Sequence, residues 1–586
     1  MFTIRYLTEL YPPNQSVTLR SDRDDWILDE PGVYTGGAWV FTIEAAPGIF
    51  TFKLRLDGIW ANDPNLAVDA VDGGTYDVGD GDLTFPAYPR VVTENGRVQR
   101  QFFTPVHDEI HEYDVVIVGS GMGGGVLASR LADTGKDVLV LEAGSYLFPT
   151  HVANLPRRLR VGTFDKHIWG LFADFSFANY VNTDGSQFAG GQAFNLGGRS
   201  VFWGGLIPRM GAWELQDWPA EIRDYLLTTG YRLAEDAMNR NGPIGSEFQQ
   251  RTKDRLSVLL PEFDHLDAPV AVQYQGYTPL SIPGGMFSTA DLLSESRLMV
   301  DEDAPKLTVN LNHAVQEVLT EGGRATGVRC LDLRDQVERT YRGKTVVLAA
   351  GSIESPKIAL LSELDDPSGL VGQGITDHPI YFTHFSLPAG SPYASPDASA
   401  KVWSRHRNTS ATEHPYNVVV EIGADFNQGR YVNSEHLAEH RRDKKDATLC
   451  EIVFLFNSPL VAGNEVTVTG PPYVPAQVTV YDAPLPDGAF AEVAGVAATV
   501  LAGLGAEAIA GENLNLQKAK LGGVAHEVGS LRAGPAGQGV VDADLKFHAY
   551  DNLYACDNSV FASSPAANPS LTLVALALRL AQHLAA

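Results

Sequence analysis

Three glycines at a fixed spacing form the first pattern in this sequence that could do chemistry. Gly119, Gly121 and Gly124 make a G-x-G-x-x-G motif directly after an apolar strand, and a helix of small residues follows. Such glycines permit a tight turn and let the backbone approach a pyrophosphate at the helix N-terminus, where unpaired N–H groups favour negative charge. Glu142 closes a second apolar strand 23 residues after Gly119, where a carboxylate is expected to bind an adenosine ribose hydroxyl. The pattern predicts dinucleotide binding.

The elements that must position this turn recur later in the chain. A strand, a turn and a helix are expected again at residues 345–362, where the turn contains Gly351, and at residues 552–585. We therefore expect one nucleotide-binding domain assembled from separated segments. A simple nicotinamide dehydrogenase would not need these later segments, so FAD is the expected cofactor.

Four separated blocks carry a specific resemblance. They are the glycine motif, NLGGRSVFWGGLIPR (195–209), TVVLAAGSIESPKIALLS (345–362) and NLYACDNSVFASSPAANPSLTLVALALRLAQHL (552–584). In this order they resemble the glucose-methanol-choline (GMC) oxidoreductases, and the resemblance extends over residues 113–586. It implies an FAD-dependent enzyme that oxidises an alcohol by hydride transfer to flavin N5.

The resemblance assigns residues 195–205 to the loop beside the flavin ring. Gly197, Gly198 and Ser200 are expected to let the backbone approach the ring. The loop is most similar to that of pyranose oxidases, which reads Gly-Gly-x-Ser-Thr-His-Trp and attaches the flavin through its histidine. Phe202 stands in that place here, and a phenyl ring offers no nitrogen for the bond. We therefore expect FAD to be held non-covalently.

Three further cofactor contacts follow from the resemblance. Val315, in a β-hairpin predicted for residues 313–328, is expected to touch the adenine end, although a β-branched residue in a strand fits a core equally well. Gly351 is expected to approach the cofactor where a strand turns into a helix. Asp557 is expected to bind the ribityl or pyrophosphate portion, and a helix N-cap is its alternative role.

The resemblance places the reaction chemistry near the C-terminus. His526 lies between glycine turns and matches the family's active-site base, and an imidazole with a pKa near 7 suits removal of a hydroxyl proton. Asn568 matches the second partner, whose amide can donate a hydrogen bond to a developing alkoxide. Pro569, Ser570 and Leu571 begin a helix whose positive end is expected to stabilise the reduced flavin.

Other residues near these motifs allow two interpretations. Residues 377–379 (Asp-His-Pro) resemble a family motif, and we expect them to link two domains structurally. Glu527 is expected to point away from His526. Three tryptophans could line a sugar site: Trp203, Trp213 and Trp218. They could also lie in a core, where large aromatics are equally common.

The first 85 residues have the pattern of a small β-sandwich, with short alternating strands broken by turns. The segment GIFTFKLRLDGIWANDPN (48–65) resembles the glycogen-binding module of AMP-activated kinase β subunits. By that resemblance Lys53 and Trp60, with Asn62 or Asn65, would grip the glucose units of a polysaccharide. Many domains of this type bind no sugar, so a purely structural role is the alternative.

Composition disfavours several classes of function. With 71 acidic and 44 basic residues the formal net charge is −27, which repels nucleic acid and anionic membrane surfaces. We expect neither a signal peptide nor a membrane-spanning helix, because no stretch has the required length and flanking charge. Cys330, Cys450 and Cys556 are too few and too scattered for a disulfide framework or a metal cluster. We expect no metal and a cytoplasmic location.

Together these patterns predict an α/β protein. It comprises a Rossmann-like FAD-binding domain built from separated segments, a sheet-based substrate domain and a small N-terminal β-sandwich. The expected boundaries are 1–85 for the β-sandwich, 86–112 for a linker or arm, 113–205, 306–375 and 523–586 for the FAD-binding domain, and 206–305 and 376–522 for the substrate domain.

The expected substrate is a sugar or glycoside whose secondary alcohol becomes a ketone, because the flavin loop and the N-terminal module both resemble parts of sugar-binding proteins. A sterol or other bulky alcohol is the alternative, since cholesterol oxidases carry the same His/Asn pair. A flavin-containing lyase and a non-catalytic sugar-binding flavoprotein are further alternatives. The electron acceptor is expected to be oxygen or a quinone.

Overall fold

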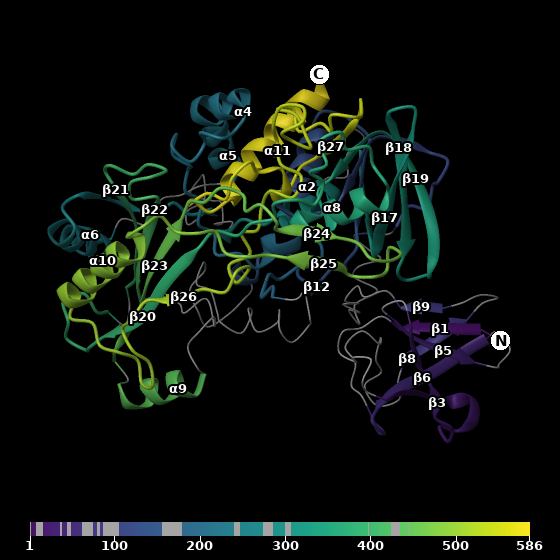
Figure 1. Ribbon diagram of the computed structural model, residues 1–586, viewed down its shortest axis with the longest axis horizontal. Helices are drawn as coiled ribbons and strands as arrows, with labels where there is room; N and C mark the ends of the chain where they lie inside the picture. The colour runs from purple at the N-terminus through teal and green to yellow at the C-terminus, as the bar shows by residue number, and fades with distance from the viewer. Residues whose placement is uncertain are drawn as a thin grey trace.

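A computed structural model gives the arrangement of the chain. The residues that it describes are 2–6, 16–35, 38–43, 48–60, 74–78, 83–85, 103, 105–154, 179–183, 185–238, 246–273, 285–298, 306–395, 398–423, 434–444 and 446–586. In Figure 1 the N-terminal strands, in purple, form a body beside the rest of the chain. Within the described residues, no helix combines the length and the apolar character that crossing a membrane would require.

A seven-stranded sheet is the centre of the largest core. Its order is β16-β11-β10-β19-β18-β17, with β27 paired to β19. The strands are β10 (Glu112–Val118), β11 (Val138–Glu142), β16 (Leu307–Leu311), β17 (His313–Glu321), β18 (Arg324–Asp332), β19 (Val337–Leu348) and β27 (Leu553–Ala555). β10 is parallel to β11 and β19, and β11 to β16, whereas β17 and β18 form an antiparallel hairpin. Strands from three separated stretches thus share one sheet, and the predicted fold class is confirmed.

Helices cover this sheet in successive layers. The helices are α2 (Met122–Asp133), α4 (Ala220–Tyr225), α5 (Tyr231–Ala237), α7 (Thr289–Leu298), α8 (Gly351–Leu361) and α11 (Ser570–Ala585), with a π-helical turn, η4 (Leu226–Gly230), between α4 and α5. α2 and α8 contact the strands of the sheet, α7 and α11 pack on α2, and α5 packs on α11. A Cβ on Gly123 would lie 1.9 Å from the carbonyl oxygen of Cys556. Only glycine therefore lets α2 approach the segment after β27.

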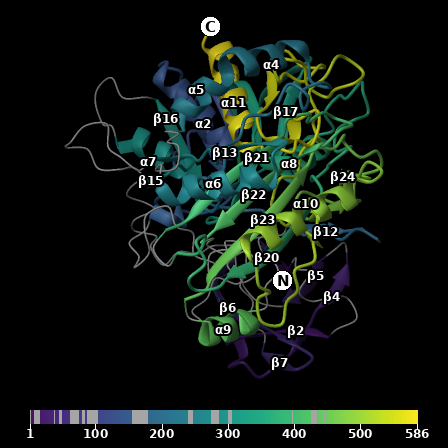
Figure 2. The same ribbon diagram turned by 90° about the vertical axis from the view of Figure 1, so that its left-hand side faces the viewer.

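A six-stranded antiparallel sheet forms the second core. Its order is β13-β21-β22-β23-β20-β26, and the strands are β13 (Phe263–Asp267), β20 (Ile380–Leu387), β21 (Ala400–His406), β22 (Tyr416–Ile422), β23 (Thr448–Phe456) and β26 (Gln517–Lys518). Side chains alternate along each strand, so Val418 and Val420 pack in one core with residues of α6 (Glu247–Leu259) and α10 (Ala489–Leu504). Figure 2 shows α6 and α10 beside this sheet.

Smaller sheets complete the described chain. β12 (Tyr180–Asn182), β25 (Ala476–Thr479) and β24 (Glu465–Thr467) form one, β14 (Val272–Gln273) pairs with β15 (Gly285–Met286), and α9 (Ser434–Asp443) precedes β23. The N-terminal strands form two sheets, β4-β5-β1-β9 and β3-β2-β6-β7 with β8 on β6. Their bounds are β1 (Phe2–Tyr6), β2 (Val17–Ser21), β3 (Glu30–Pro31), β4 (Val33–Thr35), β5 (Ala38–Ile43), β6 (Gly48–Leu56), β7 (Ile59–Trp60), β8 (Gly74–Val78) and β9 (Leu83–Phe85).

Candidate functional site

One large cavity lies where the two cores meet. Its volume is about 1270 Å³, and its lining joins the carboxyl ends of β10, β11 and β19 to residues of the six-stranded sheet. Sites for a single drug-sized ligand occupy about 300–1,000 Å³, so this cavity has room for a dinucleotide cofactor and a substrate. Ligands of open α/β sheets bind at the carboxyl ends of the strands.

The glycine turn after β10 leaves space where a pyrophosphate would lie. Gly119 has a φ of +100°, and a Cβ there would lie 2.5 Å from the Ala349 carbonyl oxygen. Gly121 lines the cavity at the start of α2, and a Cβ there would have no atom within 4 Å. The turn therefore presents backbone to an open cradle, which fits a phosphate-containing cofactor. Gly124 lies outside the lining, because it is packed against the Gly119 carbonyl.

Glu142 joins the glycine turn to the flavin loop. Its Oε2 accepts hydrogen bonds from the Ser120 backbone N–H (3.0 Å) and hydroxyl (2.6 Å), and its Oε1 accepts from Gly144 N–H (2.9 Å). The Ser120 hydroxyl in turn accepts from the Gly197 N–H at 2.9 Å. Burial raises the pKa of Glu142. The carboxylate lines the cavity and has capacity for one more donor, such as a ribose hydroxyl.

The flavin loop contributes two of its predicted residues to the lining. Gly198 and Ser200 line the cavity, whereas Gly197 does not. The Ser200 hydroxyl donates to the Gly197 carbonyl (2.6 Å) and accepts from Thr289 N–H (3.0 Å), which fastens the loop to α7. Phe202 is fully buried and packs edge-on against Phe148. It lies outside the lining as well.

The other predicted cofactor residues take different positions. Val315 and Gly351 line the cavity, and the β17–β18 register shifts after Val315. Asp557 lines it too, but its carboxylate is already bound by protein groups: Oδ2 accepts from Gly351 N–H (2.9 Å) and Oδ1 from Ser559 N–H (2.8 Å). The latter bond is the N-cap of a short 3₁₀ helix, η5 (Asn558–Val560). Burial raises the pKa of Asp557.

The beginning of α11 faces the cavity only in part. Pro569, the N-cap, and Ser570 line it. Leu571 is fully buried in the core and does not, because the first helical turn rotates its side chain away. The expected approach of the positive end of this helix to the flavin stays a prediction, carried by Pro569 and Ser570 at the cavity.

A chain of hydrogen bonds runs through His526. Nδ1 of His378 lies 2.6 Å from the Pro565 carbonyl, so it carries a hydrogen and donates it. Nε2 of His378 must then accept from Nδ1 of His526, 2.8 Å away. Nε2 of His526 is left as an acceptor, 3.3 Å from the amide nitrogen of Asn568. The chain of bonds fixes one neutral tautomer of His526, with its basic nitrogen beside Asn568 in the cavity.

The segment that carries Asn568 is held from a second side. Oε1 of the buried Glu214 accepts from the Ala567 N–H at 2.8 Å. The side-chain oxygen of Asn568 is itself buried and accepts no hydrogen bond from any described residue.

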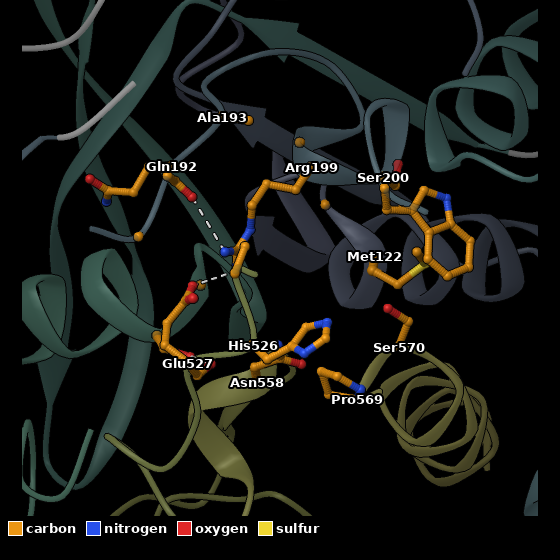
Figure 3. Close-up of a pocket in the computed structure, with 18 of the residues that line it drawn as sticks. Met122, Gln192, Ala193, Arg199, Ser200, His526, Glu527, Asn558, Pro569 and Ser570 are labelled. Carbon is orange, nitrogen blue, oxygen red and sulfur yellow. Dashed lines mark hydrogen bonds and ion pairs between the residues drawn. The ribbon is translucent and has the colours of Figure 1, made fainter. Parts of the chain in front are cut away.

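Next to His526, Glu527 turns away and forms an ion pair with Arg199 at 2.5 Å. Figure 3 shows this pair, with the His526 ring beside Pro569. Asp377 is buried near the same pair and accepts from Gly522 N–H at 2.5 Å. Burial and the negative charge of Glu527 raise the pKa of Asp377 to about 7.

The far wall of the cavity carries both charged and apolar side chains. Lys401 of β21 and Glu421 of β22 form an ion pair in it, and Glu451 of β23 lies 3.3 Å from His384. Apolar residues between them are Ile380, Val419, Val453 and Leu455, and two cations come from α9, Arg441 and Arg442. Of the three tryptophans considered for a sugar site, Trp203 lines the cavity, Trp213 does not, and Trp218 is in the core.

Sequence reasoning did not single out several of these residues. His378 was expected to have a structural role within residues 377–379, but it contacts the ring of His526 directly. Its Asp-His-Pro motif was the available signal. Lys401, Glu421 and Glu451 carried no signal, because charged residues at alternate positions of a strand are also typical of a solvent-exposed face.

Comparison with protein families supports the same interpretation of the fold. Models described as GMC oxidoreductase match residues 294–380 and 490–577, and a model for an NAD(P)-binding Rossmann-like domain matches residues 117–163. The fold and the glycine-lined cavity define a Rossmann-type FAD-binding protein. The matched segments support the GMC oxidoreductases as its family.

Individual relatives are more distant. Oxygen-dependent choline dehydrogenase 1 of Chromohalobacter salexigens is 26% identical over 309 residues, which are 46% of this chain and 53% of that protein. The corresponding enzyme of Pseudomonas putida (strain GB-1) is 28% identical over 310 residues, again 46% and 53%. The chain thus spans about half the length of the curated relatives it matches.

Two solved structures share the fold over most of the chain. Pyridoxine 4-oxidase from Mesorbium loti has a TM-score of 0.56 at 17% identity and covers 80% of this chain and 99% of its own. A formate oxidase variant from Aspergillus oryzae RIB40 has a TM-score of 0.52 at 16% identity and covers 81% and 98%. None of these four proteins is named as a sugar oxidase.

Proposed function

We propose that this protein oxidises a secondary alcohol of a sugar or glycoside to a ketone, with His526 as the base that accepts the hydroxyl proton. The observation that carries the proposal is the hydrogen-bond chain from the Pro565 carbonyl through His378 to His526. It leaves Nε2 of His526 as an acceptor in the cavity. A neutral imidazole in that tautomer can take a proton from a substrate hydroxyl.

The residues of the cavity fit FAD held without a covalent bond. Gly121 provides the open cradle and Glu142 has capacity for a ribose hydroxyl. Phe202, which is buried outside the lining, offers no nitrogen for a covalent bond to the flavin. Bound FAD supplies the two-electron acceptor that takes the hydride from the alcohol carbon. The proton goes to Nε2 of His526, so the alcohol loses one hydride and one proton and becomes a carbonyl.

Asn568 acts beside the base. Its amide N–H₂ donates to Nε2 of His526 at 3.3 Å, and a substrate hydroxyl at that nitrogen would also lie within reach of the amide. The amide can therefore orient the substrate oxygen and stabilise negative charge that develops on it.

The far wall of the cavity favours a polyhydroxylated substrate over a sterol. Lys401, Glu421 and Glu451 present charged hydrogen-bonding groups to the cavity, and a sterol that covered them would remove their remaining contact with water and offer little in return. Sugar hydroxyls can pair with such groups, and Trp203 offers an apolar surface to a sugar ring.

The proposal is tested by anaerobic reduction of the bound flavin, followed by absorbance, with a panel of monosaccharides, glycosides, sterols and choline. Flavin bleaching with sugars or glycosides is expected. Bleaching by sterols or choline alone would remove the sugar assignment, and no bleaching by any alcohol would remove the oxidase assignment. Turnover with oxygen and with a quinone then identifies the electron acceptor.

A polysaccharide is the partner that the N-terminal sheets fit best. Trp60 is 43% exposed, and the cationic groups of Lys53 and Arg55 lie 5.7 Å and 5.4 Å from its ring centre. An exposed indole with neighbouring donors can stack on and hydrogen-bond a glucose unit. Asn62 and Asn65 lie outside the described residues. Co-sedimentation with glycogen should be lost in Trp60→Ala and kept in Trp213→Ala.

A further inference from the structure

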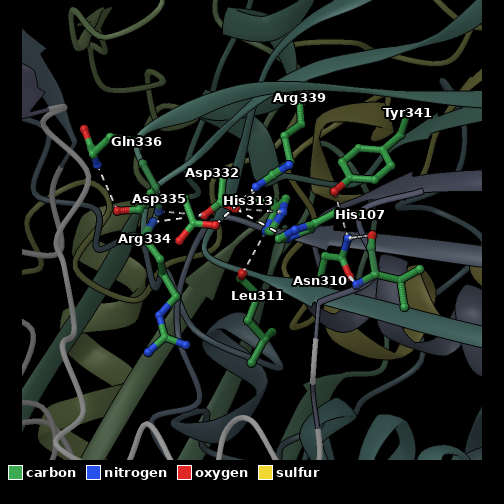
Figure 4. A network of polar contacts seen from close by, with 12 residues as sticks. His107, Asn310, Leu311, His313, Asp332, Arg334, Asp335, Gln336, Arg339 and Tyr341 are labelled. Carbon is green, nitrogen blue, oxygen red and sulfur yellow. Dashed lines mark hydrogen bonds and ion pairs between the residues drawn. The ribbon is translucent and has the colours of Figure 1, made fainter. Parts of the chain in front are cut away.

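A second histidine cluster lies where residues 105–111 meet the β17–β18 hairpin. His313 and Asp332 are opposite each other in the hairpin, and His107 comes from the segment before β10. Nε2 of His107 is 3.5 Å and Nε2 of His313 is 3.7 Å from Oδ2 of Asp332. The three ligand atoms lie within 4.8 Å of one another. Figure 4 shows the side chains converging from separate segments.

The tautomer of His313 leaves a buried acceptor without a donor. Its Nδ1 lies 2.9 Å from the Leu311 carbonyl oxygen, so that nitrogen carries the hydrogen. In the neutral ring, Nε2 then presents a lone pair toward the Asp332 carboxylate, which is also an acceptor. His313 is 1% exposed, and no described residue donates to its Nε2. Two acceptors that face each other in a buried place need a proton or a metal ion between them.

The surrounding charge also favours a cation. Arg339 is paired with three carboxylates, at 3.0 Å from Asp332, 3.2 Å from Asp335 and 3.7 Å from Glu109. Three negative charges thus share one guanidinium, which leaves an excess of two. In Figure 4 the Arg334 side chain extends away from the cluster and does not offset it.

We propose that His107, His313 and Asp332 bind one Zn²⁺ ion. Two imidazole nitrogens and one carboxylate oxygen are ligands that zinc prefers, at about 2.0–2.1 Å in a tetrahedral arrangement. Ligand atoms at that distance lie about 3.4 Å apart, close to the 3.5 Å and 3.7 Å observed. A water molecule completes the coordination. The Leu311 carbonyl holds the His313 ring in the orientation that a metal ligand requires.

The ion would fasten residues 105–111 to the FAD-binding sheet. Hydrogen bonds already hold that segment at Val106, whose N–H and carbonyl both pair with Asn310 at 2.9 Å, and at Glu109, which accepts from Thr340 N–H at 3.1 Å. The zinc site adds a further attachment at the hairpin. Its role is structural, since it shares no hydrogen bond with the network of His526 and Asn568, although His313 also lines the large cavity.

The test uses the full-length, untagged, FAD-loaded protein. After treatment with a chelator and dialysis, Zn²⁺ is titrated against a chromophoric competitor, and Co²⁺ is titrated with visible spectroscopy. One equivalent of Zn²⁺ per chain and tetrahedral Co²⁺ bands are expected, with a rise in Tm. Binding of less than one equivalent, or only six-coordinate Co²⁺ bands, would overturn the proposal.

His107→Ala is the decisive variant because His107 is partly exposed and its loss should not prevent folding. The affinity for Zn²⁺ is expected to fall at least 10²-fold, the upper end for loss of a supporting group. The matched control is His111→Ala, in the same segment, whose ring pairs with Asp137 instead. Equal affinities in wild type and His107→Ala, or equal losses in both variants, would show that the site is absent.

Discussion

The two histidine clusters of this protein differ in whether each ring nitrogen has a hydrogen-bond partner of the opposite kind. Around His526, each ring nitrogen meets a group of the opposite kind, from the Pro565 carbonyl through His378 to the Asn568 amide. Around His313, a ring nitrogen faces a carboxylate oxygen and no described residue donates to it. The first arrangement holds a proton acceptor ready in a cavity. The second has one guanidinium, that of Arg339, for three carboxylates, and leaves Nε2 of His313 without a donor among the described residues.

The comparison shows that the hydrogen-bond partner of a histidine decides its chemistry more than its burial does. His378 and His313 are both almost fully buried, and both donate from Nδ1 to a backbone carbonyl. Only the group at Nε2 differs, an imidazole N–H in one case and a carboxylate in the other.

Removing the base should break the catalytic cluster most severely. In His526→Ala the rate of flavin reduction is expected to fall at least 10³-fold, within the range for a general base. The flavin spectrum should persist, because the glycine turn and Glu142 are unchanged. Stopped-flow absorbance measures the rate, and the exposed His583→Ala serves as control. Reduction at the wild-type rate in His526→Ala would contradict the assignment.

Asn568→Ala should have a smaller effect. Loss of one donor to the developing alkoxide is expected to slow reduction about 10²-fold, while His526 keeps its bond to His378. Comparison of kcat with KM checks the reason, since a transition-state contact lowers kcat more than it raises KM. A change in KM alone would assign Asn568 to ground-state binding.

His378→Ala should slow reduction by about tenfold, because one net hydrogen bond of about 1.4 kcal/mol that orients the base is lost. His378→Gln offers a side-chain carbonyl as the acceptor and is expected to recover most of the rate. If both variants lose the same activity with the same loss of Tm, His378 has a packing role and does not position His526.

Asp377→Asn tests the surroundings of the catalytic cluster through the pH dependence of stability. Because the folded-state pKa of Asp377 is raised from 3.8 to about 7, the folded protein holds a proton that the unfolded chain releases between these values. The contribution of this carboxyl to the free energy of unfolding therefore decreases as pH rises from about 4 to 7, by about 4 kcal/mol over the whole range. The variant's Tm should fall less than that of wild type between pH 5 and pH 8. Parallel Tm curves would show that Asp377 is ionised without penalty.

The sequence predicted the fold well where residues act through local patterns. The glycine turn, the second strand ending at Glu142 and the hairpin at residues 313–328 are each set by neighbours in the chain. Sequence reasoning did not predict the role of His378 or the cluster at His107, because the contact of His378 with His526 joins residues 148 positions apart and that of His107 with Asp332 joins residues 225 positions apart. The expectation of no metal rested on cysteine spacing. That spacing carries no information about two histidines and an aspartate that come together from three segments.

Residue roles were harder to predict than residue positions. Asp557 follows its strand as expected, yet its contacts are those of an N-cap and of the Gly351 turn. Leu571 follows Pro569 as expected, but the helical rotation carries it into the core. A motif specifies which backbone approaches a ligand, and side-chain direction then depends on packing.

The pairing of β27 with β19 has a consequence for biosynthesis. β27 follows every other strand of its sheet in the chain, so it is the last of them to leave the ribosome. Until it does, the carbonyl of Cys556 against which Gly123 packs is missing, and the nucleotide cradle lacks a wall. FAD capture is therefore expected to follow synthesis of the sheet rather than accompany it.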